Sequence, residues 1–315
     1  MGADARPPIG GGHARLLDQL AVAATGAAIG VLQALGRLPL PFDARAYWDA
    51  SLDHLYGATW DATGYVYPPP MAQLLAPLHT LGWPLFIVLW TTLIWAALGW
   101  MLGRWTLLAV AGGLVAILVP GTGPLGVVFG YAMNGNVQIL LAAGIVLAIR
   151  RPGWWAAGAL TKLGTGVGIL WPLFRRDWRG VAEAVAVTSI IVAVSFALAA
   201  SLWSDWARYM LASVSVASPL PMVPVPFPVR LVMSVALIWY AARTDRAWLV
   251  AIAAGWAIPA LYAWSFLGIW IAAVAVRGAG PEAARTRHRE LIATQMRQRT
   301  RSRRWVNFNS VLRRR

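Results

Sequence analysis

The chain contains no cysteine, so it can form neither a disulfide bond nor a thiolate metal site. Its four histidines are scattered, and no two of them have the spacing of a metalloprotease pair. Neither a phosphate-binding P-loop nor a dinucleotide-binding fingerprint occurs. These absences leave no motif for a resident metal or cofactor, and we expect none.

Charged residues are also scarce, because they make up 12% of the chain whereas hydrophobic residues make up 59%. A soluble domain of 315 residues has no use for so much apolar surface. Long apolar stretches with charges only between them are typical of integral membrane proteins. We therefore expect an all-α, polytopic integral membrane protein.

The formal net charge of +15 is concentrated at the C-terminal end of the chain. Residues 277–315 contain twelve arginines but only two acidic residues, Glu282 and Glu290. No recognised nucleic-acid-binding module accompanies this charge, so we expect a cytoplasmic tail near anionic lipids and no nucleic-acid partner. Residues 1–276 then form a single transmembrane domain that precedes this tail.

The charges that flank the apolar segments predict the topology. Arg6 and Arg15 precede the first apolar segment, 16–38, whereas the loop 39–70 carries four aspartates against one arginine. The positive-inside rule therefore places the N-terminus in the cytoplasm and the acidic loop outside. The first segment is long enough to be an anchor rather than a cleaved signal peptide. Further spans are expected near residues 83–103, 106–120, 134–149, 180–200 and 228–242.

Residues 154–174 interrupt this alternation of membrane sides. Basic residues flank the segment on both sides, at Arg150, Arg151, Arg175, Arg176 and Arg179. A re-entrant hairpin satisfies both ends, with its turn at "KLGTG", where Gly164 and Gly166 permit the bend. Residues 247–276, with Pro259 near the middle, are a second candidate for a broken segment. Broken helices at membrane depth need protein or a polar cavity around their backbone, so the pattern predicts a site.

The sequence "FDARAYWDASLDHLYG", residues 42–57, predicts a short interfacial helix with Asp43 at its N-cap. On such a helix Asp43, Tyr47 and His54 fall on one face. Asp43 is thereby separated from the other carboxylates and lies beside a tyrosine and a histidine. This arrangement suits a general base, and a helix cap with no further role explains Asp43 equally well.

Lys162 is the only lysine in the chain, against 26 arginines. A cation at membrane depth costs roughly 2.5–3.5 kcal/mol even on the more lenient insertion scale, and such residues usually line a functional cavity. At the tip of the predicted hairpin, Lys162 can bind a phosphate as a compact point charge. The alternative is that its ammonium group snorkels to the membrane interface.

Four further positions are open between a binding role and a structural one. Asn136 and Gln138, in "YAMNGNVQILL", can bind sugar hydroxyls or bridge helices. Tyr67, in "YVYPPP", can stack on a sugar or lie in the interfacial aromatic belt. Arg208 can meet a lipid phosphate or form a surface ion pair with Asp205.

Three stretches of the chain resemble, in this order, glycosyltransferase family 87: "FDARAYWDA…YVYPPPMAQLLAPL", "NGNVQILLAAGIVLAIRRP" and "ALTKLGTGVGILWPLFRRDWRG". Members of this family are related to polyprenol-phosphate-dependent mannosyltransferases with the GT-C fold. The resemblance extends from about residue 42 to residue 208 and rests on the order and spacing of the stretches. It implies a GT-C-like helical bundle with re-entrant or broken helices.

The resemblance also implies a role for each candidate residue. GT-C enzymes typically carry an essential aspartate in the first external loop, and Asp43 is the matching position. It would take the proton from an acceptor hydroxyl that attacks the anomeric carbon with inversion, while polyprenyl phosphate leaves. Lys162 and Arg208 would stabilise the charge that develops on the phosphate. The other expected substrate-binding residues are Tyr47, His54, Tyr67, Asn136 and Gln138.

The sequence therefore predicts a glycosyltransferase of a bacterial plasma membrane that works on its outer face. It would transfer mannose or arabinose from a polyprenyl-phosphate donor to a lipid or glycan acceptor, and these substrates and the bilayer are the expected partners. A transporter or flippase of lipid-linked sugars is an alternative, because broken helices around a buried cation also mark transporters. An inactive relative or a non-catalytic scaffold is a further alternative.

Overall fold

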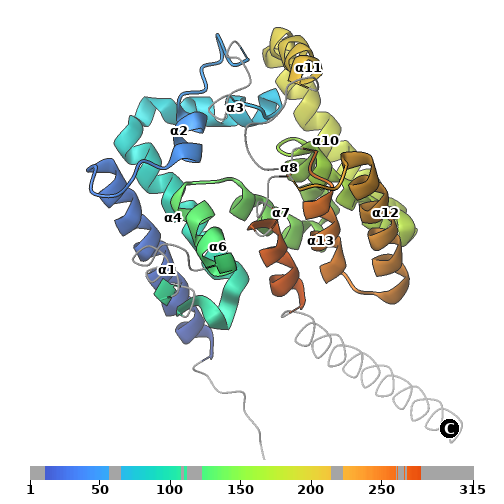
Figure 1. The fold of residues 1–315 in the computed structure, drawn as a ribbon, viewed down its shortest axis with the longest axis horizontal. Coiled ribbons are helices and arrows are strands. Elements are labelled where there is room, and N and C mark those ends of the chain that lie inside the picture. Colours follow the sequence, from blue (N-terminus) through green and yellow to red (C-terminus); the bar gives the residue numbers. More distant parts are fainter. Residues whose placement is uncertain are drawn as a thin grey trace, which may run out of the picture. The chain divides into compact units, whose positions relative to one another are not determined.

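A computed structural model of the chain is all-helical over the residues that it describes, and three of its helices are long and apolar enough to cross a membrane (Figure 1). The structure describes residues 11–56, 65–107, 110–111, 123–213, 223–259, 261, 266 and 268–277. It divides into two compact units, Met1–Ala275 and Val276–Arg315. The prediction of an all-α membrane protein is therefore confirmed, whereas nearly all of the basic tail lies outside the described residues.

The three long apolar segments are Leu16–Ala34, Trp83–Leu102 and Trp178–Leu198, where spans were predicted from the sequence. They belong to helices α1 (Gly11–Ala34), α4 (Trp83–Leu102) and α10 (Trp178–Leu198). The shorter elements in the first part of the chain are α2 (Phe42–Trp48), α3 (Pro69–Leu75), η1 (Ala76–Leu81), η2 (Gly103–Trp105), α6 (Gly123–Met133) and α7 (Gln138–Ala148). Those in the second part are η3 (Pro152–Trp154), α8 (Trp155–Ala159), η4 (Leu163–Ile169), α9 (Leu170–Phe174), α11 (Ala200–Ser213), α12 (Phe227–Thr244) and α13 (Trp248–Trp256).

Two of the predicted spans differ from the structure, and most of a third lies outside the described residues. The segment 134–149 begins with a turn, and α7 is only 11 residues long. At about 1.5 Å per residue this helix is roughly half as long as the hydrocarbon core is thick. The segment 228–242 lies within α12, which is not among the three candidate spans. Most of 106–120 lies outside the described residues.

Helices α1 and α4 pack side by side in opposite directions (Figure 1). A Cβ atom on Gly26 would lie 2.6 Å from the Cβ of Trp95, and one on Gly30 would lie 2.7 Å from the Cα of Val88. Two glycines four residues apart therefore allow the backbones to approach closely, as is common between membrane helices. The loop after α1 consequently starts beside the N-terminal end of α4.

The three consecutive prolines of the sequence start helix α3, which leads through η1 to this end of α4. Pro68 is the N-cap, with φ −56° and ψ 157°, and Pro69 is the first residue of the helix. Proline is well suited to this position because it has no N–H that would lack an intrahelical partner. Two tyrosines shortly before it, Tyr65 and Tyr67, are buried. The prolines therefore fix the point at which the acidic loop returns to the bundle.

The two segments predicted to be broken are both interrupted in the structure. In the first, residues 152–174, the chain runs through η3 and α8, turns at residues 160–162 and returns through η4 and α9. In the second, α13 ends at Trp256, and a further helix spans Gly268–Arg277. Among the described residues of the two segments, no helix is long enough to cross a membrane. The turn of the first segment differs from the prediction, because it lies just before Gly164 and Gly166, which are both within η4. In the second segment Pro259 lies in the interruption that follows α13.

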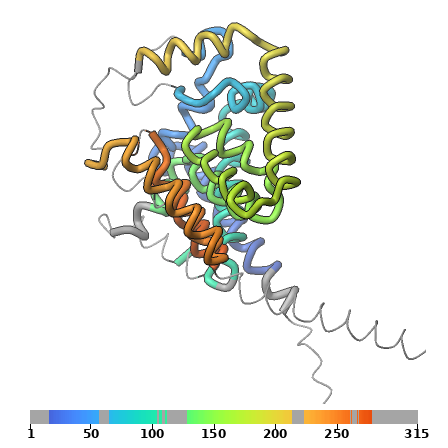
Figure 2. The backbone as a smooth tube through the Cα atoms, turned by 90° about the vertical axis from the view of Figure 1, so that its right-hand side faces the viewer, coloured from blue at the N-terminus to red at the C-terminus, as the bar shows by residue number. Residues whose placement is uncertain are grey.

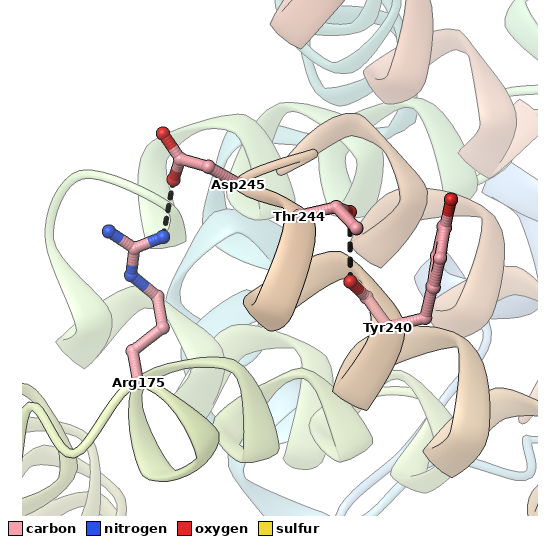
Figure 3. Close-up of polar contacts among 4 residues, drawn as sticks. All are labelled: Arg175, Tyr240, Thr244 and Asp245. Carbon is pink, nitrogen blue, oxygen red and sulfur yellow. Dashed lines mark hydrogen bonds and ion pairs between the residues drawn. The ribbon is translucent and has the colours of Figure 1, made fainter.

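The far end of the first broken segment is tied to α12 (Figure 3). Arg175 follows α9 directly and forms an ion pair with Asp245, the C-cap of α12. The guanidinium of Arg175 also lies 4.9 Å from the ring centre of Trp171. On α12, the hydroxyl of Thr244 donates to the carbonyl of Tyr240 at 2.8 Å. Of these contacts, the ion pair between Arg175 and Asp245 joins the returning leg of the segment to α12.

Helix α11 leaves the end of α10 in a new direction (Figure 2). Ala199 separates the two helices with an extended backbone, φ −161° and ψ 83°. The same end of α10 is attached to α3, because the Gln73 side chain donates to the carbonyl of Ser195 at 3.1 Å. Helices α3 and α11 therefore lie near one another, on the side of the bundle that carries the acidic loop.

Candidate active site

The turn between α6 and α7 is held in place by the two N-terminal long helices. The side-chain amide of Gln33, on α1, donates to the carbonyl of Met133 at 2.8 Å. The indole of Trp90, on α4, donates to the carbonyl of Gly135 at 2.7 Å. Gly135 has φ +72°, a conformation that glycine adopts without steric cost. These hydrogen bonds therefore fix the backbone of this turn, residues 133–136.

Helix α2 packs against that turn. The backbone N–H of Ala44 donates to the carbonyl of Asn134 at 3.1 Å, and the N–H of Val137 donates to the phenol oxygen of Tyr47 at 3.3 Å. Ala44 is fully buried, and its Cβ would lie only 2.6 Å from a Cβ placed on Gly135. The position of Asp43, which precedes Ala44, is thereby set by the turn.

Replacing Gly135 with alanine should therefore destabilise the protein. The added Cβ would collide with Ala44, and the positive φ of Gly135 would become unfavourable. We expect Gly135→Ala to lower the free energy of unfolding by roughly 1–3 kcal/mol, measured by thermal unfolding of the purified protein in detergent. Gly130→Ala is the matched control, because a Cβ at Gly130 meets nothing within 4 Å. Equal stability of the two variants would contradict this account.

The structure corrects the predicted start and end of the helix that carries Asp43. Helix α2 begins at Phe42, and its N-cap is Pro41, so Asp43 lies within the first turn and is not the cap. The helix ends at Trp48 instead of continuing towards residue 57. His54 is therefore not on the same helical face as Asp43, and its side chain is exposed. The physical reason for the early start is the extended backbone of Pro41, with φ −73° and ψ 100°.

Asp43 is half-buried and is surrounded by groups from two other segments. The side chain of Asn136 donates a hydrogen bond to its carboxyl group, and the positive charge of Lys162 acts on it. Burial raises the pKa of the Asp43 carboxyl above its usual range, whereas the Asn136 hydrogen bond and the Lys162 charge oppose that rise. A carboxylate with a raised pKa is a stronger base than an exposed one.

The charge of Lys162 acts on this carboxylate from the turn of the first broken segment. It directly precedes η4, and its carbonyl accepts hydrogen bonds from the N–H of Thr165 at 2.7 Å and from the hydroxyl of Thr165 at 2.9 Å. Thr165 is fully buried, so it fixes the backbone on which the lysine is carried. Three segments far apart in the sequence thus bring Asp43, Asn136 and Lys162 together.

Gln138 and Tyr131 extend the polar surroundings of this group. The backbone N–H of Gln138 donates to the side-chain oxygen of Asn136 at 2.9 Å, which orients the amide of Asn136 towards Asp43. Tyr131, on α6, interacts electrostatically with Asp43 and was not identified from the sequence. A Cβ on Gly268 would lie 2.9 Å from the side-chain oxygen of Gln138 and 3.5 Å from the ring of Tyr131. The last described helix therefore starts beside both residues.

The two tyrosines among the candidates are packed within the protein. Tyr47 is 2% exposed and Tyr67 is 8% exposed, and their phenol oxygens are hydrogen-bonded at 3.2 Å. Tyr56 donates to the carbonyl of Tyr67 at 2.7 Å, and the ring of Trp90 lies 5.6 Å from that of Tyr47. The structure thus places Tyr47 and Tyr67 in an aromatic cluster that supports α2.

Arg208 is not brought to Asp43 in the structure. It lies on α11, where its side chain is 77% exposed and forms an ion pair with Asp205. This is the surface pairing that was one of the two possibilities open from the sequence. Neither Arg208 nor His54 is among the groups that perturb the Asp43 carboxyl.

One buried cation was missed in the sequence analysis. Arg230, on α12, is 2% exposed and binds backbone carbonyl groups near the end of α13. It fell inside a predicted span, 228–242, where an arginine is costly and therefore noteworthy. Among the described residues there is no group of three or more histidine or acidic side chains that could hold a metal ion.

Comparison with known proteins identifies one matching family. The model of glycosyltransferase family 87 matches residues 65–294. No curated protein and no solved structure matched the chain. The matched region includes Asn136, Lys162 and Arg230 but begins after Asp43. It also extends well past residue 208, where the resemblance seen in the sequence became weak.

Proposed function

Because the chain belongs to glycosyltransferase family 87, a family of membrane glycosyltransferases, we propose that it transfers a sugar from a polyprenyl-phosphate donor to a lipid or glycan acceptor. The observation that carries this proposal is the convergence of Asp43, Asn136 and Lys162 from three separate segments. A base and a cation placed side by side are what such a displacement needs. Mannose and arabinose are the proposed sugars.

In this mechanism Asp43 is the general base. It accepts the proton of an acceptor hydroxyl as that oxygen forms a bond to the anomeric carbon. The bond between the anomeric carbon and the phosphate oxygen breaks in the same step, and its electron pair goes to the phosphate. A single displacement with one carboxylate inverts the configuration at the anomeric carbon. The hydrogen bond from Asn136 keeps the carboxylate oriented for this step.

Lys162 has the complementary role on the donor side. Negative charge develops on the phosphate oxygen as the bond to the sugar breaks, and a nearby ammonium group stabilises it. The position of Lys162 at a backbone turn, braced by Thr165, supports this assignment. Until the donor arrives, Lys162 and Asp43 balance one another's charge.

We further propose that the reaction takes place on the outer face of a bacterial plasma membrane. Arg6 and Arg15, which precede the apolar segment of α1, favour a cytoplasmic N-terminus, with the basic C-terminal tail on the same side near anionic lipids. Because α1 and α4 run in opposite directions, α2 lies at the end of α1 that is reached after one crossing. This arrangement supports an external position for Asp43.

The direct test uses protein reconstituted in liposomes with radiolabelled polyprenyl-phosphate mannose or arabinose and a lipid extract as acceptor. We expect label to move into a new glycolipid or glycan in the presence of protein but not in empty liposomes. Protein-dependent movement of the labelled lipid between leaflets, without any product, would instead favour a transporter. Absence of both product and movement would contradict the proposal for these two sugars.

The environment of Asp43 predicts how the rate depends on pH. The base works only when deprotonated, so transfer is present above the pKa of Asp43 and is lost as the pH falls through it. Asn136→Leu removes a hydrogen bond that lowers this pKa, so we expect the acid limb of kcat/KM to move to higher pH. Asn134→Leu, at an exposed side chain of the same turn, is the control and should leave the limb unchanged. An identical acid limb in the two variants would contradict the assignment.

A further inference from the structure

The side chain of Arg230 is buried among backbone carbonyl groups near the start of α12. Its Nε donates to the carbonyl of Val225 at 2.9 Å. One terminal nitrogen donates to the carbonyls of Trp256 at 2.9 Å and Ile258 at 2.6 Å, and the other donates to that of Pro259 at 2.7 Å. A single guanidinium group therefore connects α12 to the interruption after α13.

These carbonyl groups need a donor because the helix stops there. The last carbonyls of a helix have no N–H partner from a following turn, and Pro259 contributes no N–H of its own. A guanidinium has five N–H donors, and four of those of Arg230 are used on carbonyls. Few donors are left for a phosphate, so the arrangement favours holding the broken backbone over binding the anionic donor.

The same interruption is in direct contact with the turn that carries Lys162. A Cβ placed on Gly164 would lie 1.8 Å from the carbonyl oxygen of Ala257 and 2.8 Å from the Cα of Ile258. Only a glycine allows the two backbones to come so close. Gly164 is two residues from Lys162, and Thr165 binds the Lys162 carbonyl. A shift of residues 256–259 would therefore displace the lysine.

We infer that Arg230 is a positioning residue that holds Lys162 beside Asp43 by fixing residues 256–259 against Gly164. Arg230 would touch neither the donor nor the acceptor. Its effect on sugar transfer rests on the proposed function, whereas its effect on the position of the lysine does not. The two effects can therefore be measured separately.

The first measurement needs no enzymatic activity and uses the absence of cysteine from the chain. In a Lys162→Cys variant the only thiol lies at the turn, and its alkylation by a water-soluble maleimide in liposomes reports the position of that turn. Adding Arg230→Lys replaces the planar guanidinium group by an ammonium group with one nitrogen. That nitrogen cannot reach the carbonyls of Trp256, Ile258 and Pro259 at the same time. We expect the alkylation rate to rise at least fivefold.

The matched control is Arg243→Lys, because Arg243 is an exposed arginine on the same helix whose guanidinium lies 5.5 Å from the ring centre of Trp239. It should leave the alkylation rate within twofold. Equal rates with Arg230→Lys and Arg243→Lys would overturn the inference. If Arg230→Lys does not fold, as judged by thermal unfolding in detergent, Arg230→Gln retains two of the N–H donors and takes its place under the same criteria.

The second measurement is a double-mutant cycle on the transfer rate. We expect Arg230→Lys alone to lower kcat at least tenfold and to change the donor KM by less than threefold. In a Lys162→Met background the same substitution should cost less than twofold, because the lysine that it positions is gone. If Arg230→Lys lowers kcat by the same factor in the Lys162→Met background as in the wild type, the inference is overturned. If no variant transfers sugar but alkylation responds as expected, the proposed function fails and the positioning role of Arg230 stands.

Discussion

Asp43→Asn is expected to reduce the rate of sugar transfer by about 10²- to 10⁴-fold, the range that a general base typically contributes. Asparagine has nearly the shape of aspartate and can still accept the hydrogen bond from Asn136, but it cannot take a proton at neutral pH. The fold of the site should therefore survive the substitution. Initial rates at saturating donor, together with equilibrium binding of the donor, separate the loss of chemistry from a loss of affinity.

Asp49→Asn is the matched control for this experiment. Asp49 is the C-cap of the same short helix, is exposed, and forms an ion pair with Arg45 at 2.8 Å. Exposed pairs of this kind contribute about 0–1 kcal/mol, so Asp49→Asn should keep close to the full rate. Equal rates of wild type and Asp43→Asn would remove Asp43 from the chemistry. Equal losses in both variants would indicate a general defect of α2.

The sequence was informative about the fold wherever one local rule decided the outcome. The scarcity of charge and the long apolar segments predicted an all-α membrane protein. In the part of the chain that the structure describes, the three helices able to span a membrane lie where they were expected. Basic residues on both sides of 154–174, and Pro259 in the second segment, marked the two interruptions of regular helix. These features depend on solvation and on backbone chemistry, which are readable without tertiary contacts.

Local pattern failed where tertiary contacts set the ends of an element. The sequence predicted a helix that carries both Asp43 and His54, but α2 ends at Trp48. His54 therefore lies outside this helix and shares no helical face with Asp43. Asp43 resembled an N-cap because aspartate favours that position, yet Pro41 occupies it. What fixes α2 is its docking on Gly135, a contact between distant segments that no local pattern contains.

In the candidate site, too, local sequence features identified some residues, whereas tertiary contacts decided the place of others. Asp43, Lys162 and Asn136 were each singled out by residue type and surroundings, and the structure brings them together. Tyr47 and Tyr67 had the correct chemistry for sugar binding, but their burial in an aromatic cluster depends on packing that the sequence did not reveal. Arg230 was missed because its hydrogen-bond partners are backbone carbonyls, which have no sequence signature.

Lys162→Met is the second large effect that we expect, with a loss of about 10²- to 10³-fold in kcat, similar to removal of one oxyanion-stabilising donor. Methionine preserves most of the length and apolar volume of lysine but carries no charge. The donor KM should change much less, because charge on the phosphate bridging oxygen grows mainly as the bond to the sugar breaks. Measuring kcat and the donor KM separately tests this division.

Leu163→Met is the control for this variant, because it introduces the same side chain at the neighbouring residue of the turn, where Leu163 is 47% exposed. It should retain nearly the full rate. Lys162→Arg should recover only part of the activity, because a guanidinium is larger and places its donors in a planar fork rather than at one point. A Lys162→Met enzyme within twofold of wild type would show that the phosphate leaves without help from this cation. The proximity of Lys162 to Asp43 would then serve only to balance a buried carboxylate.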